Sequence, residues 1–145
     1  MRITSYTDYA LRVLIYLAAE PGRKTTIREI STTFGISKNH LMKVVNQLSR
    51  LGYIDSVRGK NGGLNLHCSP TEVNLGILFQ QTETDLGLVE CYTENNTCSI
   101  TPACQLKHIL AEAQQAFIDV LGQYSLADLV TARHRPELLK LLNLN

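Results

Sequence analysis

Residues 26–67 carry two short helical segments, a tight turn and a glycine-rich hairpin in direct succession. The first helix is expected to start at the capping box Thr26-x-x-Glu29 and to end at the turn Phe34-Gly35-Ile36. Ser37 then caps a second helix, whose apolar stripe ends just before Gly52. Two helices joined in this way predict a helix-turn-helix.

The helix-turn-helix leads directly into two alternating segments, 53–57 and 64–67, which flank the turn Arg58-Gly59-Lys60-Asn61-Gly62-Gly63. Alternating segments around a glycine-rich turn predict a β-hairpin. A hairpin in this position is the wing of a winged helix. The expected fold class is therefore mainly α with a small β-hairpin wing, that is, a winged helix-turn-helix plus a long dimerisation helix.

Helices are also expected in the rest of the chain, and their starts are predicted at Ser5-x-x-Asp8, Leu75, Thr101-Pro102, Ser125-x-x-Asp128 and Pro136. The helix that starts at Thr101-Pro102 is the longest, and its broad apolar face, which extends to about Leu121, predicts pairing with a second chain. We expect three regions: a DNA-binding domain over 1–82, a cysteine-bearing loop over 83–104, and a dimerisation helix with C-terminal helices that pack back on the domain over 102–145.

The charges of the chain are divided unevenly between its two halves. The 145 residues have a formal net charge of only +1, which by itself argues against a nucleic-acid binder. However, residues 1–67 contain ten Lys and Arg against four Asp and Glu, a net charge of +6, whereas residues 68–145 contain four against nine, a net charge of −5. The basic half therefore has the charge that a phosphate binder needs.

No segment predicts export or membrane insertion. The apolar stretch near the N-terminus has about ten residues and is interrupted by Arg12, so it is too short to cross a bilayer and lacks the pattern of a signal peptide. We expect a cytoplasmic protein with no membrane partner. In that reducing compartment the four cysteines, at positions 68, 91, 98 and 104, are thiols or metal ligands rather than disulfides.

The polar face of the helix that Ser37 caps, together with the wing, predicts a DNA-reading surface. Its expected contact residues are Ser37, Lys38, Asn39, His40, Met42, Lys43, Arg50, Arg58 and Lys60. Base edges in the major groove are assigned to Asn39, His40, Met42 and Lys43, and Asn46 and Gln47 lie on the same face. Ser37 and Arg50 are expected to hold phosphates, while Arg58 suits a minor groove. A merely solvated helix face is the alternative, but the adjoining wing favours DNA.

Three cysteines, Cys91-x6-Cys98-x5-Cys104, lie in a polar segment with few hydrophobic anchors. A structural zinc site normally has close cysteine pairs and four ligands, whereas iron–sulfur clusters tolerate looser spacing, so the spacing favours a cluster over zinc. Cys68 lies before a proline and far from the triplet, and we expect it to act as a small hydrophobe.

Three other classes of protein remain as alternatives. A redox enzyme or electron carrier would leave the winged helix unexplained, and no glycine-rich nucleotide loop, flavin motif or acid–base pair is visible, so we expect no enzyme. A zinc-stapled interaction module is a second alternative. A repressor whose cysteines switch by thiol oxidation without metal is the third.

The segments SYTDYALRVLIYLA, SKNHLMKVVNQLSRLGYIDSVRGKNGG and Cys91-x6-Cys98-Ser-Ile-Thr-Pro-Ala-Cys104 resemble the iron–sulfur winged-helix repressors over essentially the whole chain. That family includes a regulator of cluster biogenesis and nitric-oxide-sensitive repressors. The acidic Asp8, the wing Arg-Gly-Lys-Asn-Gly-Gly and the Ile-Thr-Pro-Ala-Cys motif are most similar to the nitric-oxide-sensitive members.

The resemblance implies one iron–sulfur cluster per subunit, either 2Fe–2S or 4Fe–4S, held by Cys91, Cys98, Cys104 and Asp8 of the partner subunit. From the sequence alone, Asp8 is a capping-box carboxylate, and the resemblance reverses that preference. The cluster-biogenesis regulator carries a fourth-ligand histidine three residues after its last cysteine, a position that is Lys107 in this chain; His108 is expected at a surface or interface.

The resemblance further implies a homodimer that represses transcription by binding double-stranded operator DNA. Nitric oxide would be the effector, and nitrosylation or loss of the cluster would release the DNA and derepress genes of nitrosative stress. A regulator of the same type that responds to iron or redox state is the alternative within the family. Cys104 is expected in the first turn of the long helix, where the helix N-terminus favours an anionic ligand.

Overall fold

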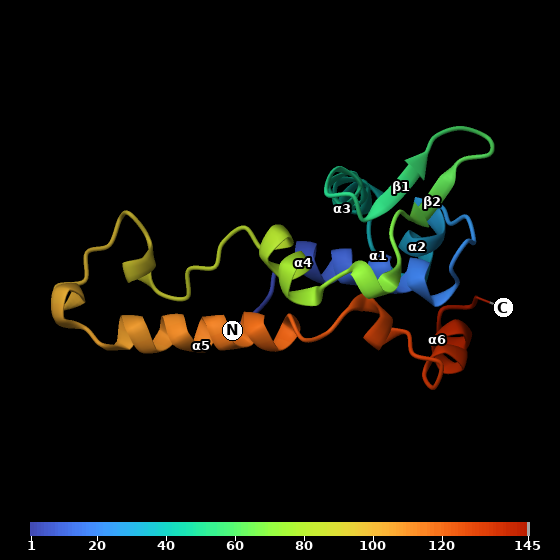
Figure 1. Ribbon diagram of the computed structural model, residues 1–145. Coiled ribbons are helices and arrows are strands. Elements are labelled where there is room, and N and C mark those ends of the chain that lie inside the picture. The colour runs from blue at the N-terminus through green and yellow to red at the C-terminus, as the bar shows by residue number, and fades with distance from the viewer. Residues whose placement is uncertain (145) are drawn as a thin grey trace.

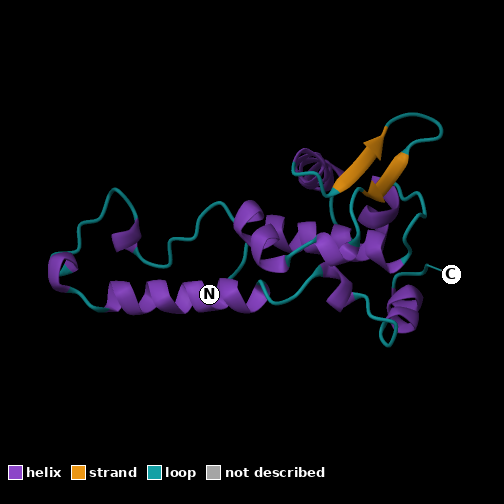
Figure 2. Cartoon of the chain, in the orientation of Figure 1, coloured by secondary structure: helices purple, strands orange, loops and turns teal. Residues whose placement is uncertain are grey.

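The computed structural model describes residues 1–144, which form a mainly helical body, one β-hairpin and a long helix that extends away from the body (Figure 1). The helices are α1 Ser5–Ala19, α2 Ile27–Phe34, α3 Lys38–Arg50, α4 Leu75–Thr82, α5 Leu106–Leu121 and α6 Arg135–Leu141. The strands are β1 Ile54–Val57 and β2 Gly63–Leu66, and the short 3-10 turns are η1 Pro70–Glu72, η2 Glu90–Tyr92, η3 Thr101–Ala103 and η4 Leu126–Leu129 (Figure 2). In the described part of the chain, no helix combines the length and the apolar character that crossing a membrane requires.

The structure confirms the winged helix-turn-helix. The Thr26 hydroxyl accepts a hydrogen bond from the N–H of Glu29 at 3.2 Å and caps α2, while Gly35 ends that helix with a left-handed backbone (φ 66°). Ser37 caps α3 by accepting from the N–H of His40 at 3.1 Å. The two strands pair antiparallel, with Ile54 opposite Leu66 and Val57 opposite Gly63.

The hydrophobic core surrounds α1, which packs against α3, α4, α6 and η4. Fully buried side chains come from α1, α3, α4 and η4, among them Leu14, Leu41, Leu48, Leu78 and Leu126. Leu142 and Leu144 belong to the same core, so the end of the described chain packs on the winged helix.

The helix α5 packs against α4 at one end and projects from the body at the other (Figure 1). A Cβ atom at Gly76 of α4 would lie 2.8 Å from the Cα and N of Gly122, so the absence of a side chain at Gly76 allows this close crossing. Only Ile118 of α5 is buried, whereas Leu106, Ile109 and Val120 are each more than half exposed. The protomer therefore presents an apolar helix face that it does not itself cover.

The predicted N-caps Ser5 and Thr101 were wrong. The cap of α1 is Thr4 rather than Ser5, because the Thr4 hydroxyl accepts from the N–H of Thr7 at 3.3 Å. The long helix starts at Leu106 rather than at Thr101, because the Thr101 hydroxyl donates to the carbonyl of Cys98 at 2.8 Å instead of capping a helix. Cys104 consequently has an extended backbone (φ −80°, ψ 114°) and is not in the first turn of α5.

Candidate DNA-reading surface and cysteine segment

The outward face of α3 carries most of the side chains expected to contact DNA. Lys38, Asn39, Lys43 and Arg50 are exposed, and Met42 is 47% exposed although it is apolar. The opposite face is buried through Leu41, Val44, Val45 and Leu48. This division follows from the helical period, which places the apolar and polar residues of the segment on opposite sides.

The wing carries Arg58 and Lys60 on the exposed turn between β1 and β2. The Lys24 ammonium donates to the carbonyl of Asn61 at 2.9 Å and ties this turn to the segment before α2. A groove of about 400 Å³ lies between the wing and α3, and its lining includes Thr26, Met42, Asn46 and Arg58. The wing and the polar face of α3 therefore border one continuous surface.

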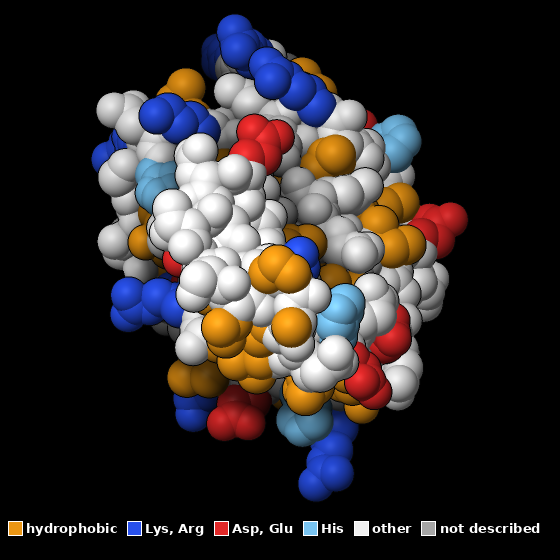
Figure 3. Space-filling model, turned by 90° about the vertical axis from the view of Figure 1, so that its left-hand side faces the viewer, with side chains coloured by type: hydrophobic (Ala, Val, Ile, Leu, Met, Phe, Trp, Pro, Cys, Tyr) orange, Lys and Arg blue, Asp and Glu red, His pale blue; other side chains and the backbone are white. Residues whose placement is uncertain are grey.

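Basic side chains gather along the upper edge of the molecule in Figure 3, on the side where the hairpin and α3 project in Figure 1. Acidic side chains are more frequent lower down on the same face. On this face the basic upper edge agrees with the basic N-terminal half of the sequence, although further Lys and Arg side chains lie at the left and lower edges, and it supplies a positive edge for a DNA backbone.

Two side chains on the polar side of α3 turn toward the body instead of toward solvent. The ring of His40 packs edge-on against Tyr9 of α1, with ring centroids 4.8 Å apart. Gln47 is half-buried: its carbonyl accepts from the hydroxyl of Tyr6, and its amide donates to the carbonyl of Gln81 at 3.3 Å. The sequence does not reveal these contacts, because they join helices that are far apart along the chain.

Hydrogen bonds between its own residues hold the cysteine segment, residues 83–104, together. The carboxylate of Glu90 accepts from the N–H and the hydroxyl of Thr97 at 3.0 and 2.8 Å, which joins the residue before Cys91 to the residue before Cys98. These bonds, the one from the backbone N–H first, lower the pKa of the Glu90 carboxyl because they favour its charged form. The Tyr92 hydroxyl donates to the carbonyl of Lys107 at 2.7 Å and attaches the segment to the start of α5.

All four cysteines are free thiols, but their surroundings differ. Cys98 is exposed, whereas Cys91 and Cys104 are half-buried. Cys68 packs against the hydrophobic core, and burial raises the pKa of its thiol, with a further contribution from Glu72. The packing of Cys68 against the core agrees with the prediction that it acts as a small hydrophobe.

The three remaining thiols suit iron by their chemistry, but the structure does not bring them together in one group. Over residues 1–144, no three His, Cys, Asp or Glu side chains form a group that could hold a metal ion. Three accessible thiols in one hydrogen-bonded loop are nevertheless the donors that iron–sulfur clusters use. The residue types therefore suit a cluster, whereas the described residues do not gather them into one binding site. The exposed His108, at the start of α5, is not part of a described ligand group.

Asp8 lies one turn into α1, with a side chain that is 39% exposed. It forms a bidentate ion pair with Arg12, at 2.8 Å to Nη2 and 3.2 Å to Nε. An exposed pair of this kind contributes only about 0–1 kcal/mol, so the carboxylate can exchange partners at low cost. Within one protomer, α1 lies in the body while η2 and η3 lie near the projecting end of α5 (Figure 1).

A family model described as Rrf2, an iron-dependent transcriptional regulator, matches residues 3–132. The chain belongs to the Rrf2 family. Among similar proteins, the HTH-type transcriptional regulator NsrR of Bacillus subtilis (strain 168) is 48% identical over 146 residues and covers 99% of both chains. The regulator of the same name from Halalkalibacterium halodurans is 47% identical with the same coverage. The Rrf2 chain is thus a transcriptional regulator, as the resemblance implied.

Solved structures of the family share the fold of this Rrf2 chain. The oxidized form of CymR from Staphylococcus aureus is 26% identical, with a TM-score of 0.72 over 90% of this chain and 96% of that one. CymR of B. subtilis, the global cysteine regulator, is 25% identical, with a TM-score of 0.70 and the same coverage. An IscR from T. potens, at 22% identity and a TM-score of 0.69, shares the fold.

Proposed function

We propose that this Rrf2 protein is a nitric-oxide-sensing repressor that binds operator DNA as a homodimer while an iron–sulfur cluster is intact, and releases the DNA when the cluster is nitrosylated or lost. The observation that carries the proposal is the combination of three free thiols in one closed loop with a winged helix, in a chain 48% identical to a regulator named NsrR. Derepression of nitrosative-stress genes would follow from release of the operator.

The cluster, either 2Fe–2S or 4Fe–4S and one per subunit, would supply iron that reacts with nitric oxide. Cys91, Cys98 and Cys104 would hold it as thiolates. Asp8 of the partner subunit would complete the site, because the carboxylate is partly exposed and only weakly paired with Arg12. A carboxylate is a harder and weaker partner for cluster iron than a thiolate, which suits a site that a diatomic molecule opens.

The homodimer would form along α5. Its uncovered apolar face is the kind of surface that a two-fold partner covers, since the same patch on each copy contacts the other. Two copies would present two α3 helices to a pseudo-palindromic operator and would double the basic surface. The regions 1–82, 83–104 and 102–145 would then serve as DNA-binding, cluster-binding and dimerisation regions.

Ser37, Lys38, Asn39, His40, Met42, Lys43, Arg50, Arg58 and Lys60 remain the proposed DNA contacts. His40 would act partly through its packing on Tyr9, which orients the start of α3. The exposed side chains near the N-terminus of α3 would read base edges, and Arg58 would enter a minor groove.

The experiment that tests this function combines two measurements on anaerobically purified protein. We expect a brown protein with bound iron whose absorption spectrum changes on addition of nitric oxide, and whose operator complex dissociates over the same range of nitric oxide. A colourless, iron-free protein that binds its operator equally well before and after nitric oxide would refute the proposal.

A metal-free thiol switch is the second candidate. It is favoured by the four free thiols and by the likeness to a CymR whose structure is described as an oxidized form. In that case mild oxidation would change operator affinity in protein that contains no iron, and dithiothreitol would restore it. Iron content of the active protein therefore separates the two candidates.

Replacing Asp8 by alanine is expected to change the absorption spectrum of the cluster and to speed its removal by a chelator at least about tenfold, because one ligand is lost. Glu137→Ala, which removes an exposed carboxylate of α6, is the control and should leave both unchanged. An unchanged spectrum and an unchanged response to nitric oxide in Asp8→Ala protein would disprove the ligand assignment.

Replacing Arg58 by alanine is expected to weaken operator binding by about 1–3 kcal/mol and to lower the salt dependence by about one ion, because a wing contact to the minor groove is lost. Fluorescence anisotropy at several salt concentrations measures both. Arg133→Ala removes an exposed positive charge just before α6, on the opposite side of the body from the hairpin, and should have little effect (Figure 1). Equal affinities for Arg58→Ala and wild type at physiological salt would remove the wing from the reading surface.

A further inference from the structure

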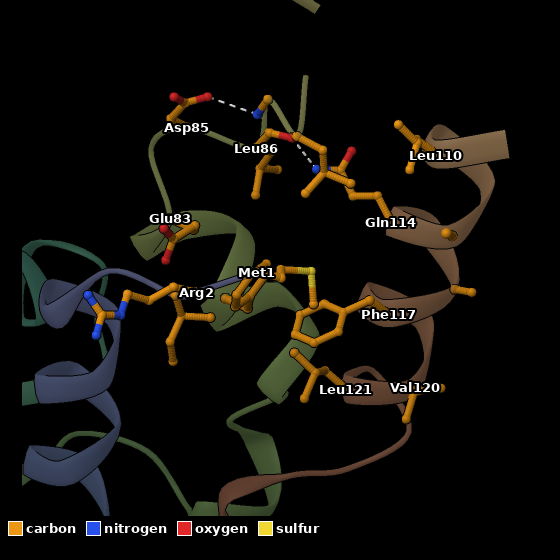
Figure 4. Close-up of a pocket in the computed structure, with 16 residues that line it drawn as sticks. Met1, Arg2, Glu83, Asp85, Leu86, Leu110, Gln114, Phe117, Val120 and Leu121 are labelled. Atoms are coloured by element: carbon orange, nitrogen blue, oxygen red, sulfur yellow. Dashed lines mark hydrogen bonds between the residues drawn. The ribbon is translucent and has the colours of Figure 1, made fainter. Parts of the chain in front are cut away.

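Glu83 is a buried carboxylate at the point where α4 ends and the cysteine segment begins (Figure 4). Its side chain is only 7% exposed, and none of the ion pairs among residues 1–144 involves it. Both of its oxygens accept from the N–H of Thr4 at 3.2 Å. It also accepts from the hydroxyls of Thr4 and Thr7, at 3.2 and 2.6 Å.

These four hydrogen bonds place the carboxylate at the N-terminus of α1. A buried charge is tolerated only where several donors face it, and the first turn of a helix favours a negative charge. Thr4 is the cap of α1 and Thr7 lies within its first turn, so Glu83 fixes the direction in which α1 leaves its cap. Asp8 is the next residue on that turn.

Gln81, two residues before Glu83, connects the same end of α4 to the DNA-reading elements. Its backbone carbonyl accepts from the amide of Gln47 on α3 at 3.3 Å. Its side-chain carbonyl accepts from the hydroxyl of Tyr53, the residue before β1. The end of α4 is thus hydrogen-bonded to α1, to α3 and to the root of the wing.

The segment that follows Glu83 is hydrogen-bonded to α5. The amide of Gln114 donates to the carbonyl of Leu86, three residues after Glu83. A cavity of about 760 Å³ lies between the start of the cysteine segment, the N-terminal residues and α5, and Glu83 and Gln114 line different parts of it (Figure 4). Residues 81–86 therefore connect α5, which follows the cysteine segment, to α1, α3 and the wing.

We propose that Gln81 and Glu83 are positioning residues that transmit the state of the cysteine segment to α1, α3 and the wing. The proposal rests on the proposed function, because it supposes that this state changes operator affinity. A displaced cysteine segment would pull Glu83 away from Thr4 and Thr7, and α1 would then lose the contacts that orient it. Since α1 holds Gln47 of α3 through Tyr6, the recognition helix would shift with it.

The test uses Glu83→Gln, which keeps the volume but replaces one acceptor oxygen with a donor that faces the donors of Thr4 and Thr7. In the full-length, cluster-loaded dimer we expect about fivefold or more weaker operator binding, with iron content and absorption spectrum unchanged. Glu94→Gln makes the same chemical change at an exposed carboxylate of the cysteine segment and should not weaken binding.

Thr7→Val provides a second variant that keeps the carboxylate and the shape of the side chain while it removes one donor. In a double-mutant cycle, the effects of Thr7→Val and Glu83→Gln on operator affinity should be clearly non-additive, because both substitutions break the same contact. Hydrogen exchange of the first-turn amides of α1, measured in anaerobically purified protein, should become faster in both single variants and stay unchanged in Glu94→Gln.

Additive effects in the cycle, unchanged exchange at α1, or a changed cluster spectrum in Glu83→Gln would each overturn the positioning role. The exchange measurement requires neither operator DNA nor nitric oxide. If wild-type protein holds no cluster, the proposed function fails, whereas the exchange data still decide whether Glu83 orients α1.

Discussion

Replacing Cys98 by alanine is expected to lower operator affinity by about 50-fold or more in anaerobically prepared protein, because loss of one thiolate would prevent assembly of the cluster that we propose favours the DNA-binding state. Cys98 is exposed and lies in a loop outside the hydrophobic core. The free energy of unfolding of the cluster-free protein should therefore change by no more than about 0.5 kcal/mol. A loss of DNA binding without a loss of stability would assign the effect to the cluster.

Cys68→Ala is the matched control for Cys98→Ala, because it also removes one thiol. Cys68 packs against the core and lies outside the cysteine segment, so this variant should keep its iron and its operator affinity while losing some stability. Iron analysis, the absorption spectrum and anisotropy with an operator fragment measure the three quantities. Cys98→Ala protein that binds DNA as tightly as wild type would rule out control by a cluster.

Replacing Gly76 by valine is expected to destabilise the protein by about 3 kcal/mol, because even the first carbon of the new side chain meets backbone rather than a movable side chain. A Cβ at this position would lie 2.8 Å from Gly122 Cα and 2.9 Å from the carbonyl oxygen of Ile118. The crossing of α4 and α5 would have to open. Because α4 ends at the residues that contact α1 and α3, operator affinity should fall as well.

Gly122→Ala is the control for this close crossing, since it adds a side chain to the other partner of the same contact. Its Cβ would lie 3.4 Å or more from its neighbours, and the backbone there is helical (φ −66°, ψ −14°). This variant should be neutral or about 0.4–1 kcal/mol more stable. Urea denaturation of both variants measures the difference, and an unfolding free energy for Gly76→Val equal to that of wild type would show that the crossing is not tight.

The elements of the winged helix could be predicted because their signals are local. Gly35, Ser37 and the glycine-rich turn of the wing each act within a few residues, and the apolar stripe of α3 repeats with the helical period. The start of α5 was mispredicted for the opposite reason. The pattern Thr101-Pro102 is a valid helix start, but the Thr101 hydroxyl bonds to Cys98 within the folded cysteine segment.

For the DNA-reading surface and the cysteine segment, the sequence predicts which residue types take part but not how they are placed in space. The three thiols and their common segment are evident in the sequence, and so is the basic face of α3. The inward direction of Gln47 and the burial of Glu83 are not evident in the sequence, because both depend on partners in other helices. Gln47 lies 34 positions from Gln81, and Glu83 lies 79 positions from Thr4.

The sequence by itself determined a basic winged helix, an acidic half with three clustered thiols, and a helix whose apolar face exceeds what one chain covers. These properties follow from residue types, spacing and local backbone preference, which act before distant parts of the chain meet. Only the tertiary structure decided which polar side chains leave the solvent, where Cys104 lies relative to α5, and how the end of α4 joins the cysteine segment to α1 and α3. Those features depend on hydrogen bonds and close packing between segments that folding alone brings together.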